Sequence, residues 1–241
     1  MSAPIKLLFL HGYTQSGPSF HAKTRALEKT VLKALPTGSS LHFPTAPHPL
    51  QPSDLPGGPR APSTVPSDNW AWWRRNDTTG VYAGLDETWV FLSAYLTTHG
   101  PFDGCIGFSQ GGALAALLTS LLERSRPIPP SFTTTHPPFK FSVSYSGFRL
   151  SDGVYYDPPI ATPTLHFLGS LDTVVDEERS MQLVQACVDG TRHVVFHPGG
   201  HYLPAGRQYV GVLVGFVREC VGLGSAGEGG KVVGGGADLP F

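Results

Sequence analysis

The hydrophobic positions alternate along the chain between short apolar runs and longer amphipathic segments. Short apolar runs are typical of buried strands, and they occur at Ile5–Leu10, Leu41–Phe43, Gly104–Phe108, Phe141–Ser146, Thr164–Leu168 and His193–Phe196. Segments with apolar residues three or four positions apart predict helices, at Ser19–Leu35, Leu85–Thr98, Gly111–Leu122, Glu177–Val188 and Tyr209–Val221. Because the two kinds alternate, the sequence predicts an α/β fold with a mostly parallel central sheet and helices on both faces.

Proline and glycine mark two segments that do not fit this alternation. Pro44–Pro66 contains eight prolines. Proline lacks an amide donor and fixes φ, so this segment is expected to form neither helix nor central strand. Glycine dominates Gly222–Gly236, which predicts a mobile tail. We therefore expect one α/β domain over residues 1–222, with a Pro-rich surface excursion at 44–66, and a Gly-rich tail over 223–241.

Charge and cysteine content narrow the function classes. The 241 residues include 17 Lys and Arg against 18 Asp and Glu, for a net charge of −1. A nearly neutral chain has no electrostatic reason to bind nucleic acid or an anionic membrane. Cys105, Cys187 and Cys220 lack the spacing of a zinc site or a disulfide framework, and Ile5–Leu10 is too short to be a signal peptide or a membrane span. We expect a cytoplasmic protein with no metal and no cofactor. The sequence does not set its oligomeric state.

A G-x-S-x-G pattern, Gly107-Phe108-Ser109-Gln110-Gly111, lies between a predicted strand and a predicted helix. This context is the one in which the pattern forms a nucleophile elbow. Glycine fits the flanking positions because the turn is tight, and the N-terminus of the following helix favours negative charge near the serine. The pattern predicts that Ser109 is a nucleophile. The alternative is an ordinary turn in which the serine caps the helix.

A serine nucleophile needs a base and an acid that orients the base. In this topology their order along the chain is Ser, Asp, His. His201 lies in the Gly-containing loop after the last predicted strand, and His197 in the same loop is the alternative. Asp172 follows the preceding strand and is the favoured acid. Asp176 competes with it, although its position before two glutamates is typical of a helix N-cap.

Acyl transfer also needs two N–H donors for the oxyanion. The backbone N–H of Gln110 is one, and the N–H of Tyr13, in the loop after the first strand, is the other. Trp72 and Trp73 follow the Pro-rich excursion and are candidates for the substrate pocket. Alternatively, they anchor the excursion on the core. Arg74 and Arg75 are candidate contacts for a carboxylate or a phosphopantetheine phosphate, or else solvated surface residues.

Several segments taken together resemble the fungal serine hydrolase family of α/β-hydrolases, over about residues 5–220. They are Leu8-Phe9-Leu10-His11-Gly12-Tyr13-Thr14-Gln15, Trp70-Ala71-Trp72-Trp73, Gly100-Pro101-Phe102-Asp103-Gly104 with the G-x-S-x-G pattern, and His197-Pro198-Gly199-Gly200-His201. The resemblance implies a compact hydrolase core without a large lid domain, with Ser109, Asp172 and His201 as the triad. It also implies cleavage of carboxylic esters.

Relatives in fungal secondary metabolism release polyketide acyl chains from a carrier protein. From this resemblance we expect a serine esterase or thioesterase that forms an acyl-enzyme. An acyl carrier protein is then a candidate partner beside a small ester or acyl-thioester substrate. The alternative is a non-catalytic module that binds a small molecule on the same fold. Retention of a complete Ser-Asp-His order favours the enzyme.

Overall fold

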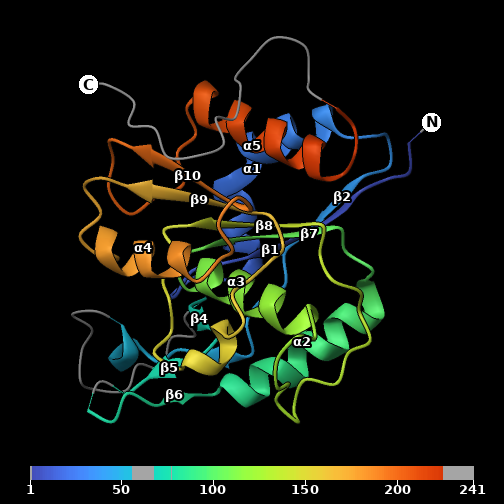
Figure 1. The fold of residues 1–241 in the computed structure, drawn as a ribbon. Helices are drawn as coiled ribbons and strands as arrows, with labels where there is room; N and C mark the ends of the chain where they lie inside the picture. The colour runs from blue at the N-terminus through green and yellow to red at the C-terminus, as the bar shows by residue number, and fades with distance from the viewer. Residues whose placement is uncertain (1, 56–67, 77, 225–241) are drawn as a thin grey trace.

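The structure is a computed structural model that describes residues 2–55, 68–76 and 78–224. Within them lies a six-stranded sheet in the order β10-β9-β8-β7-β1-β2 (Figure 1). Its strands are β1 (Lys6–Leu10), β2 (Ser40–His42), β7 (Gly104–Phe108), β8 (Phe141–Tyr145), β9 (Thr164–Gly169) and β10 (Arg192–His197). All neighbouring strands are parallel, which confirms the predicted sheet. The carboxyl ends of the strands therefore lie along one edge, where open α/β sheets carry their sites.

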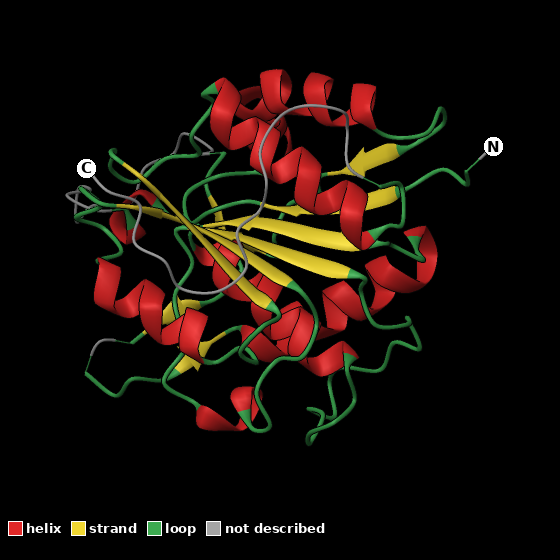
Figure 2. Cartoon of the chain, turned by 45° about the horizontal axis from the view of Figure 1, so that its top comes forward, coloured by secondary structure: helices red, strands yellow, loops and turns green. Residues whose placement is uncertain are grey.

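Helices cover both faces of the sheet, as Figures 1 and 2 show. One face is covered by α1 (Gly17–Ala34) and α5 (Arg207–Cys220), and the other by α2 (Leu85–His99), α3 (Gln110–Leu122) and α4 (Glu177–Gln185). Every residue of α3 is buried. This helix lies in the interior, which accounts for its Ala/Leu-rich sequence.

The side chains of the central strands alternate between two hydrophobic cores. In β1, Leu8 and Leu10 pack into the core beside α3, whereas Leu7 and Phe9 pack into the core beside α1 and α5. All four are fully buried. A strand covered on both faces is apolar at consecutive positions, which explains why this part of the sequence shows no alternation of polar and apolar residues.

Short elements join the sheet to its loops. They are the antiparallel pair β3 (His48–Pro49) and β4 (Trp70–Ala71), the antiparallel pair β5 (Arg74–Arg75) and β6 (Tyr82–Ala83), and the 3₁₀ helices η1 (Pro52–Asp54) and η2 (Gly153–Tyr156). The pairing of β3 with β4 connects the start of the Pro-rich segment to the tryptophan-rich segment that follows it.

The expectation that Pro44–Pro66 contains no helix is wrong at η1. Pro52 occupies the first turn of this 3₁₀ helix, where the N–H that proline lacks would have no partner within the helix. Leu50 and Ala46 in the same segment are buried, so this part of the predicted surface excursion contributes to the core. Residues 56–66 lie outside the described residues.

The Gly-rich tail is described only at its start. The Arg218 guanidinium on α5 donates to the backbone carbonyl of Leu223 at 3.0 Å and to that of Gly224 at 3.2 Å. It also donates to the carbonyl of Ala34 at the end of α1, at 2.6 Å. The rest of the predicted tail, residues 225–241, lies outside the described residues, and the division into one domain and a tail stays a prediction. No helix among the described residues is long and apolar enough to cross a membrane.

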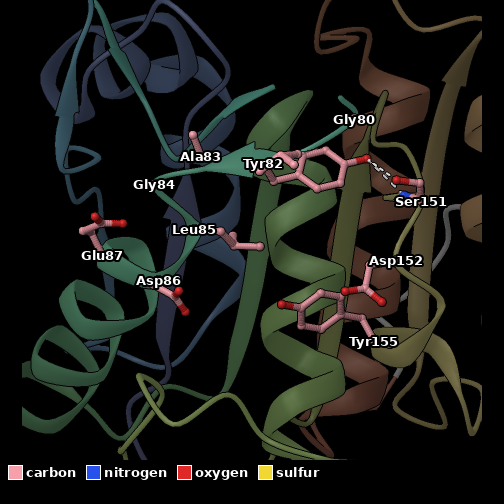
Figure 3. A pocket seen from close by; sticks show the side chains of 11 residues that line it. Gly80, Tyr82, Ala83, Gly84, Leu85, Asp86, Glu87, Ser151, Asp152 and Tyr155 are labelled. Atoms are coloured by element: carbon pink, nitrogen blue, oxygen red, sulfur yellow. Dashed lines mark hydrogen bonds between the residues drawn. The ribbon is translucent and has the colours of Figure 1, made fainter. Parts of the chain in front are cut away.

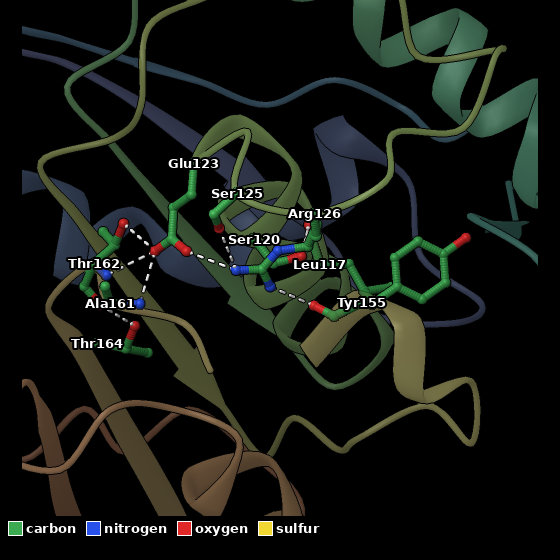
Figure 4. Close-up of polar contacts among 9 residues, drawn as sticks. All are labelled: Leu117, Ser120, Glu123, Ser125, Arg126, Tyr155, Ala161, Thr162 and Thr164. Atoms are coloured by element: carbon green, nitrogen blue, oxygen red, sulfur yellow. Dashed lines mark hydrogen bonds and ion pairs between the residues drawn. The ribbon is translucent and has the colours of Figure 1, made fainter. Parts of the chain in front are cut away.

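A buried ion pair ties the end of α3 to the loop before β9 (Figure 4). Glu123 Oε2 accepts from the Arg126 guanidinium at 2.9 Å. Its other oxygen accepts from the Ala161 N–H at 2.9 Å and from the N–H and hydroxyl of Thr162 at 2.7 and 2.8 Å. Arg126 in turn donates to the Tyr155 carbonyl at 2.7 Å. The carboxylate therefore links α3, η2 and the approach to β9, the strand that precedes Asp172.

Candidate active site

Ser109 lies between the end of β7 and the start of α3, near the middle of the sheet edge. Its backbone has φ 53° and ψ −116°, a conformation that costs energy for any residue other than glycine. A Cβ at Gly107 would overlap the Gly111 carbonyl, and one at Gly111 would overlap the Leu10 carbonyl. Glycine is therefore required at both flanking positions, for the steric reason that the pattern implied. Ser109 is 8% exposed.

His201 and Asp172 meet beside this elbow. The His201 Nδ1 lies 2.7 Å from Asp172 Oδ2, and the imidazole ring packs 4.9 Å from the ring of Phe108, the residue before Ser109. The Asp172 side chain is 3% exposed. Its second oxygen accepts from the N–H groups of Val174 and Val175, both at 2.9 Å. These contacts fix the carboxylate from two sides.

The pKa of Asp172 is lowered from its ordinary value. Burial is the largest influence and raises the pKa, but it is outweighed by the hydrogen bonds from Val175, His201 and Val174. The folded protein therefore keeps this carboxylate ionised, in the form that accepts the Nδ1–H of a neutral imidazole.

Asp176 and His197, the alternatives to Asp172 and His201, have different surroundings. Asp176 is the N-cap of α4, where its Oδ1 accepts from the Arg179 N–H at 2.9 Å, and this confirms the predicted capping role. His197 is buried, and its ring packs at 5.1 Å from the ring of Tyr202 and 5.9 Å from that of Tyr209. Burial lowers the pKa of His197. Neither of its ring nitrogens has a hydrogen-bond partner among the described residues.

The two candidate oxyanion donors follow the ends of adjacent strands, β1 and β7. Leu10 at the end of β1 lies opposite Gly107 of β7, so the loop with Tyr13 lies next to the elbow. The Gly12 N–H is taken by Gln15 Oε1 at 3.1 Å, and the Thr14 N–H by the Trp70 carbonyl at 3.0 Å. The intervening Tyr13 N–H has no acceptor among the described residues. The Gln110 N–H begins α3, where helical N–H groups have no partner within the helix.

His11 anchors the first of these loops, a role that the sequence alone does not indicate. Its Nε2 accepts from the Ala46 N–H at 3.0 Å, and its carbonyl accepts from the Trp72 indole N–H at 2.9 Å. Burial, the largest influence, lowers the pKa of His11 to about 4. A neutral imidazole is required here because Nε2 acts as an acceptor.

Trp72 and Trp73 are buried, with exposed fractions of 0% and 2%. The Trp72 carbonyl accepts from the Thr88 hydroxyl on α2. These contacts fit the alternative interpretation, in which the two tryptophans anchor the excursion on the core. Their contact with substrate stays a prediction. The Arg74 guanidinium donates to the Pro49 carbonyl at 2.6 Å and lies 3.6 Å from the Asp54 carboxylate. It therefore binds residues of the Pro-rich excursion.

A cavity of about 630 Å³ lies away from the candidate triad, between β6, the start of α2 and residues 151–155 (Figure 3). The Tyr82 hydroxyl borders it and accepts from the Ser151 N–H at 3.0 Å. Asp86, Glu87 and Asp152 also line it. The Tyr82 ring lies 6.3 Å from that of Trp73. The described residues hold no cluster of three or more His, Cys, Asp or Glu that could bind a metal ion.

Comparison with known proteins identifies the family. The sequence profile of the family described as "Serine hydrolase (FSH1)" matches residues 1–213. The chain belongs to the FSH1 serine hydrolase family. The predicted resemblance to fungal serine hydrolases is thereby confirmed.

The chain is similar in sequence to two curated relatives and in structure to one solved protein. A Schizosaccharomyces pombe protein named dihydrofolate reductase is 37% identical over 219 residues, 87% of this chain and 46% of that protein. The chain spans about half the length of this and a second S. pombe relative. Esterase OVCA2 of Danio rerio is 36% identical over 238 residues, 91% of this chain and 99% of that protein. Zea mays acyl-protein thioesterase 2 has a TM-score of 0.65 at 18% identity, covering 92% of this chain and 95% of that one.

The likeness to the maize structure concerns the fold. With the sheet order and the helix layers, it establishes the predicted α/β-hydrolase fold, and the described residues contain no large lid domain.

Proposed function

We propose that this chain cleaves a carboxylic ester or an acyl thioester through an acyl-enzyme intermediate. Ser109 is the nucleophile, His201 is the general base and acid, and Asp172 orients His201. The N–H groups of Tyr13 and Gln110 bind the oxyanion. The observation that carries this proposal is the 2.7 Å contact between His201 Nδ1 and a buried carboxylate, beside a serine in a strained elbow.

The chemistry follows from these positions. Asp172 accepts the Nδ1–H of neutral His201, so Nε2 is free to take the Ser109 hydroxyl proton. The Ser109 oxygen attacks the acyl carbonyl, and the negative charge develops on the carbonyl oxygen beside the two N–H donors. His201 returns the proton to the leaving alkoxide or thiolate, and the acyl group stays on Ser109. His201 then takes a proton from a water molecule as its oxygen attacks the acyl carbon, and it returns that proton to the Ser109 oxygen as the bond to the acyl group breaks and the carboxylic acid leaves.

Exposed apolar residues next to the candidate triad support an acyl substrate. Leu171 and Val174, on either side of Asp172 in the chain, are 69% and 61% exposed, and Tyr202, after His201, is 51% exposed. The Leu171 N–H donates to the Gly199 carbonyl at 3.0 Å, so the two loops lie side by side. Apolar surface of this kind gains free energy when an acyl chain covers it.

The experiment compares wild type and Ser109→Ala on a series of p-nitrophenyl acyl esters of increasing chain length. We expect hydrolysis by the wild type. The rate of the variant should be lower by several orders of magnitude, because it lacks the nucleophile. A residual rate from substrate binding and the oxyanion hole should survive. Equal rates for the two proteins would contradict the proposal. A wild type that binds the esters without turnover would favour the non-catalytic module.

The finer form of the proposal is release of a polyketide acyl chain from an acyl carrier protein, in the cytoplasm. Arg179 supports it. Its guanidinium lies 4.7 Å from the Phe148 ring centroid and donates to the Val174 carbonyl at 3.4 Å. It forms no ion pair with any described residue, so a phosphopantetheine phosphate beside the Asp172 loop would find a free cation. The thiols of Cys105 and Cys187 are buried and unpaired. Cysteines stay unpaired in reducing compartments such as the cytoplasm, which supports the proposed location.

A pair of thioesters tests this form. The same acyl group is presented on N-acetylcysteamine and on a phosphopantetheinylated carrier protein. We expect a kcat/KM at least about tenfold higher for the carrier-bound form, because one charge-assisted contact contributes about 1.5 kcal/mol or more. Arg179→Gln should remove this preference. Equal kcat/KM values for the two wild-type substrates would contradict carrier recognition and leave the esterase proposal standing.

A further inference from the structure

The carboxamide of Gln110 makes two hydrogen bonds that the proposed chemistry does not use. Its side chain is buried, with 5% of the residue exposed. Oε1 accepts from the Trp72 backbone N–H at 2.9 Å, and Nε2 donates to the Trp73 carbonyl at 2.8 Å. The donor and the acceptor fix the orientation of the amide, because the reversed amide would place two donors together and two acceptors together.

The same tryptophan-rich segment is also bonded to the loop of the other oxyanion donor. The Trp72 indole N–H donates to the His11 carbonyl at 2.9 Å, and the His11 and Trp72 rings lie 5.0 Å apart. The Trp70 carbonyl accepts from the Thr14 N–H at 3.0 Å. These bonds hold the loop at the residue on each side of the pair Gly12-Tyr13. Residues 70–73 therefore connect the Tyr13 loop to the residue that follows the nucleophile.

We propose that the Gln110 side chain is a positioning residue that sets the spacing of the two oxyanion donors. It fastens residues 70–73 to the elbow, and these residues hold the loop that presents the Tyr13 N–H. The inference rests on the proposed function. An oxyanion hole acts only when its donors lie about 2.7–3.1 Å from the developing oxyanion, so a loosened connection weakens binding of the transition state more than binding of the substrate.

The backbone groups of the segment have few other partners. The Thr88 hydroxyl already binds the Trp72 carbonyl, whereas the Trp72 N–H and the Trp73 carbonyl have the Gln110 amide. Replacing that amide by an apolar side chain leaves both groups buried without a partner, and such groups draw the backbone toward water or another acceptor. The displacement would act on the segment that links the two donors.

Gln110→Met tests the inference, because methionine has a similar length and cannot make either hydrogen bond. Gln185→Met is the matched control, since Gln185 is exposed on α4. The assay measures kcat and KM on an ester, with the active fraction counted by complete fluorophosphonate labelling. We expect kcat per labelled site to fall about 10- to 100-fold in Gln110→Met, less than the loss of a whole oxyanion donor. KM should change by less than about threefold, and the control should match the wild type.

Gln110→Glu adds a pH readout. One carboxylate oxygen can still accept from the Trp72 N–H, but the other would face the Trp73 carbonyl and repel it. Protonation converts that oxygen into a donor and restores the second hydrogen bond. The ratio of the kcat of this variant to that of the wild type should therefore rise as the pH falls. A purely structural role would lower the folded fraction and leave kcat per labelled site unchanged.

The outcomes separate this inference from the proposed function. If wild-type Ser109 is not labelled, the proposed function fails. If the wild type is labelled and active, and Gln110→Met retains kcat per labelled site within about twofold, the positioning role is overturned and the proposed function stands. If Gln110→Met does not fold, Gln110→Glu decides, because its carboxylate keeps the hydrogen bond from the Trp72 N–H and loses only the one to the Trp73 carbonyl. Lower kcat per site in that variant supports the inference, and an unchanged value overturns it.

Discussion

Replacing Asp172 by asparagine should abolish most turnover while the fold is retained. The oxygen of the new carboxamide can keep the two hydrogen bonds that Asp172 Oδ1 accepts from Val174 and Val175 at 2.9 Å. Its amide nitrogen would then face His201 Nδ1, 2.7 Å from the present Oδ2, and would donate to it. Nδ1 becomes an acceptor, the ring proton moves to Nε2, and His201 can no longer take the Ser109 proton.

The magnitude follows from this change of tautomer. The equivalent substitution in a serine triad lowers kcat about 10⁴-fold, which corresponds to about 5 kcal/mol of activation free energy. Asp176→Asn is the matched control, because asparagine caps a helix as well as aspartate does. We expect its kcat to lie within about twofold of the wild type.

The assay measures kcat on a p-nitrophenyl ester for both variants, with the thermal unfolding midpoint as a check on folding. A large loss in Asp176→Asn together with near wild-type activity in Asp172→Asn would reverse the assignment of the acid. Equal activity in all three proteins would refute the role of an orienting carboxylate.

Three other outcomes test the structure more broadly. Glu123→Gln should lower the free energy of unfolding by about 3 kcal/mol in urea titrations, because it leaves the buried Arg126 without its carboxylate, whereas the exposed control Glu219→Gln should not. The pKa of His11 in the folded protein is lowered to about 4. As the pH falls, His11 is therefore protonated in the unfolded chain before it is protonated in the folded protein. The contribution of His11 to the free energy of unfolding should then fall by about 3 kcal/mol as the pH drops from about 6.5 to 4, and a slope no shallower in His11→Gln would refute this. Activity should persist in EDTA, because the proposed serine and histidine supply nucleophile and base, and loss restored by a divalent ion would argue otherwise.

Much of the scaffold could be predicted because its elements carry strong local signals. The strand Gly104–Phe108 agrees with β7 at both ends, and the helix expected at Leu85–Thr98 ends within one residue of α2. The end of the helix expected at Glu177–Val188 was placed too late. α4 ends at Gln185, and Ala186 and Cys187 beyond it are buried outside the helix. Periodicity does not distinguish a helical turn from a buried turn of another kind.

Some features of the candidate site could also be predicted from the sequence, and others could not. The elbow could be predicted, because the need for glycine at Gly107 and Gly111 is a local steric demand that leaves a sequence pattern. The proximity of Asp172 to His201 followed from the rule that parallel strands end at one edge. The connections made by His11 and by the Gln110 carboxamide could not be predicted. Their partners lie 35 to 61 residues away, in segments that form at most two-residue strands and leave no periodic signal.

The most direct test of the central claim is covalent labelling of the intact protein with a fluorophosphonate, followed by peptide mapping. The proposal predicts one adduct per chain, located on Ser109, with labelling abolished in Ser109→Ala and strongly slowed in Asp172→Asn, because the probe reports the activated serine oxygen. Labelling that persists undiminished in Ser109→Ala, or an adduct mapped to another residue, would contradict the assignment of Ser109 as the nucleophile.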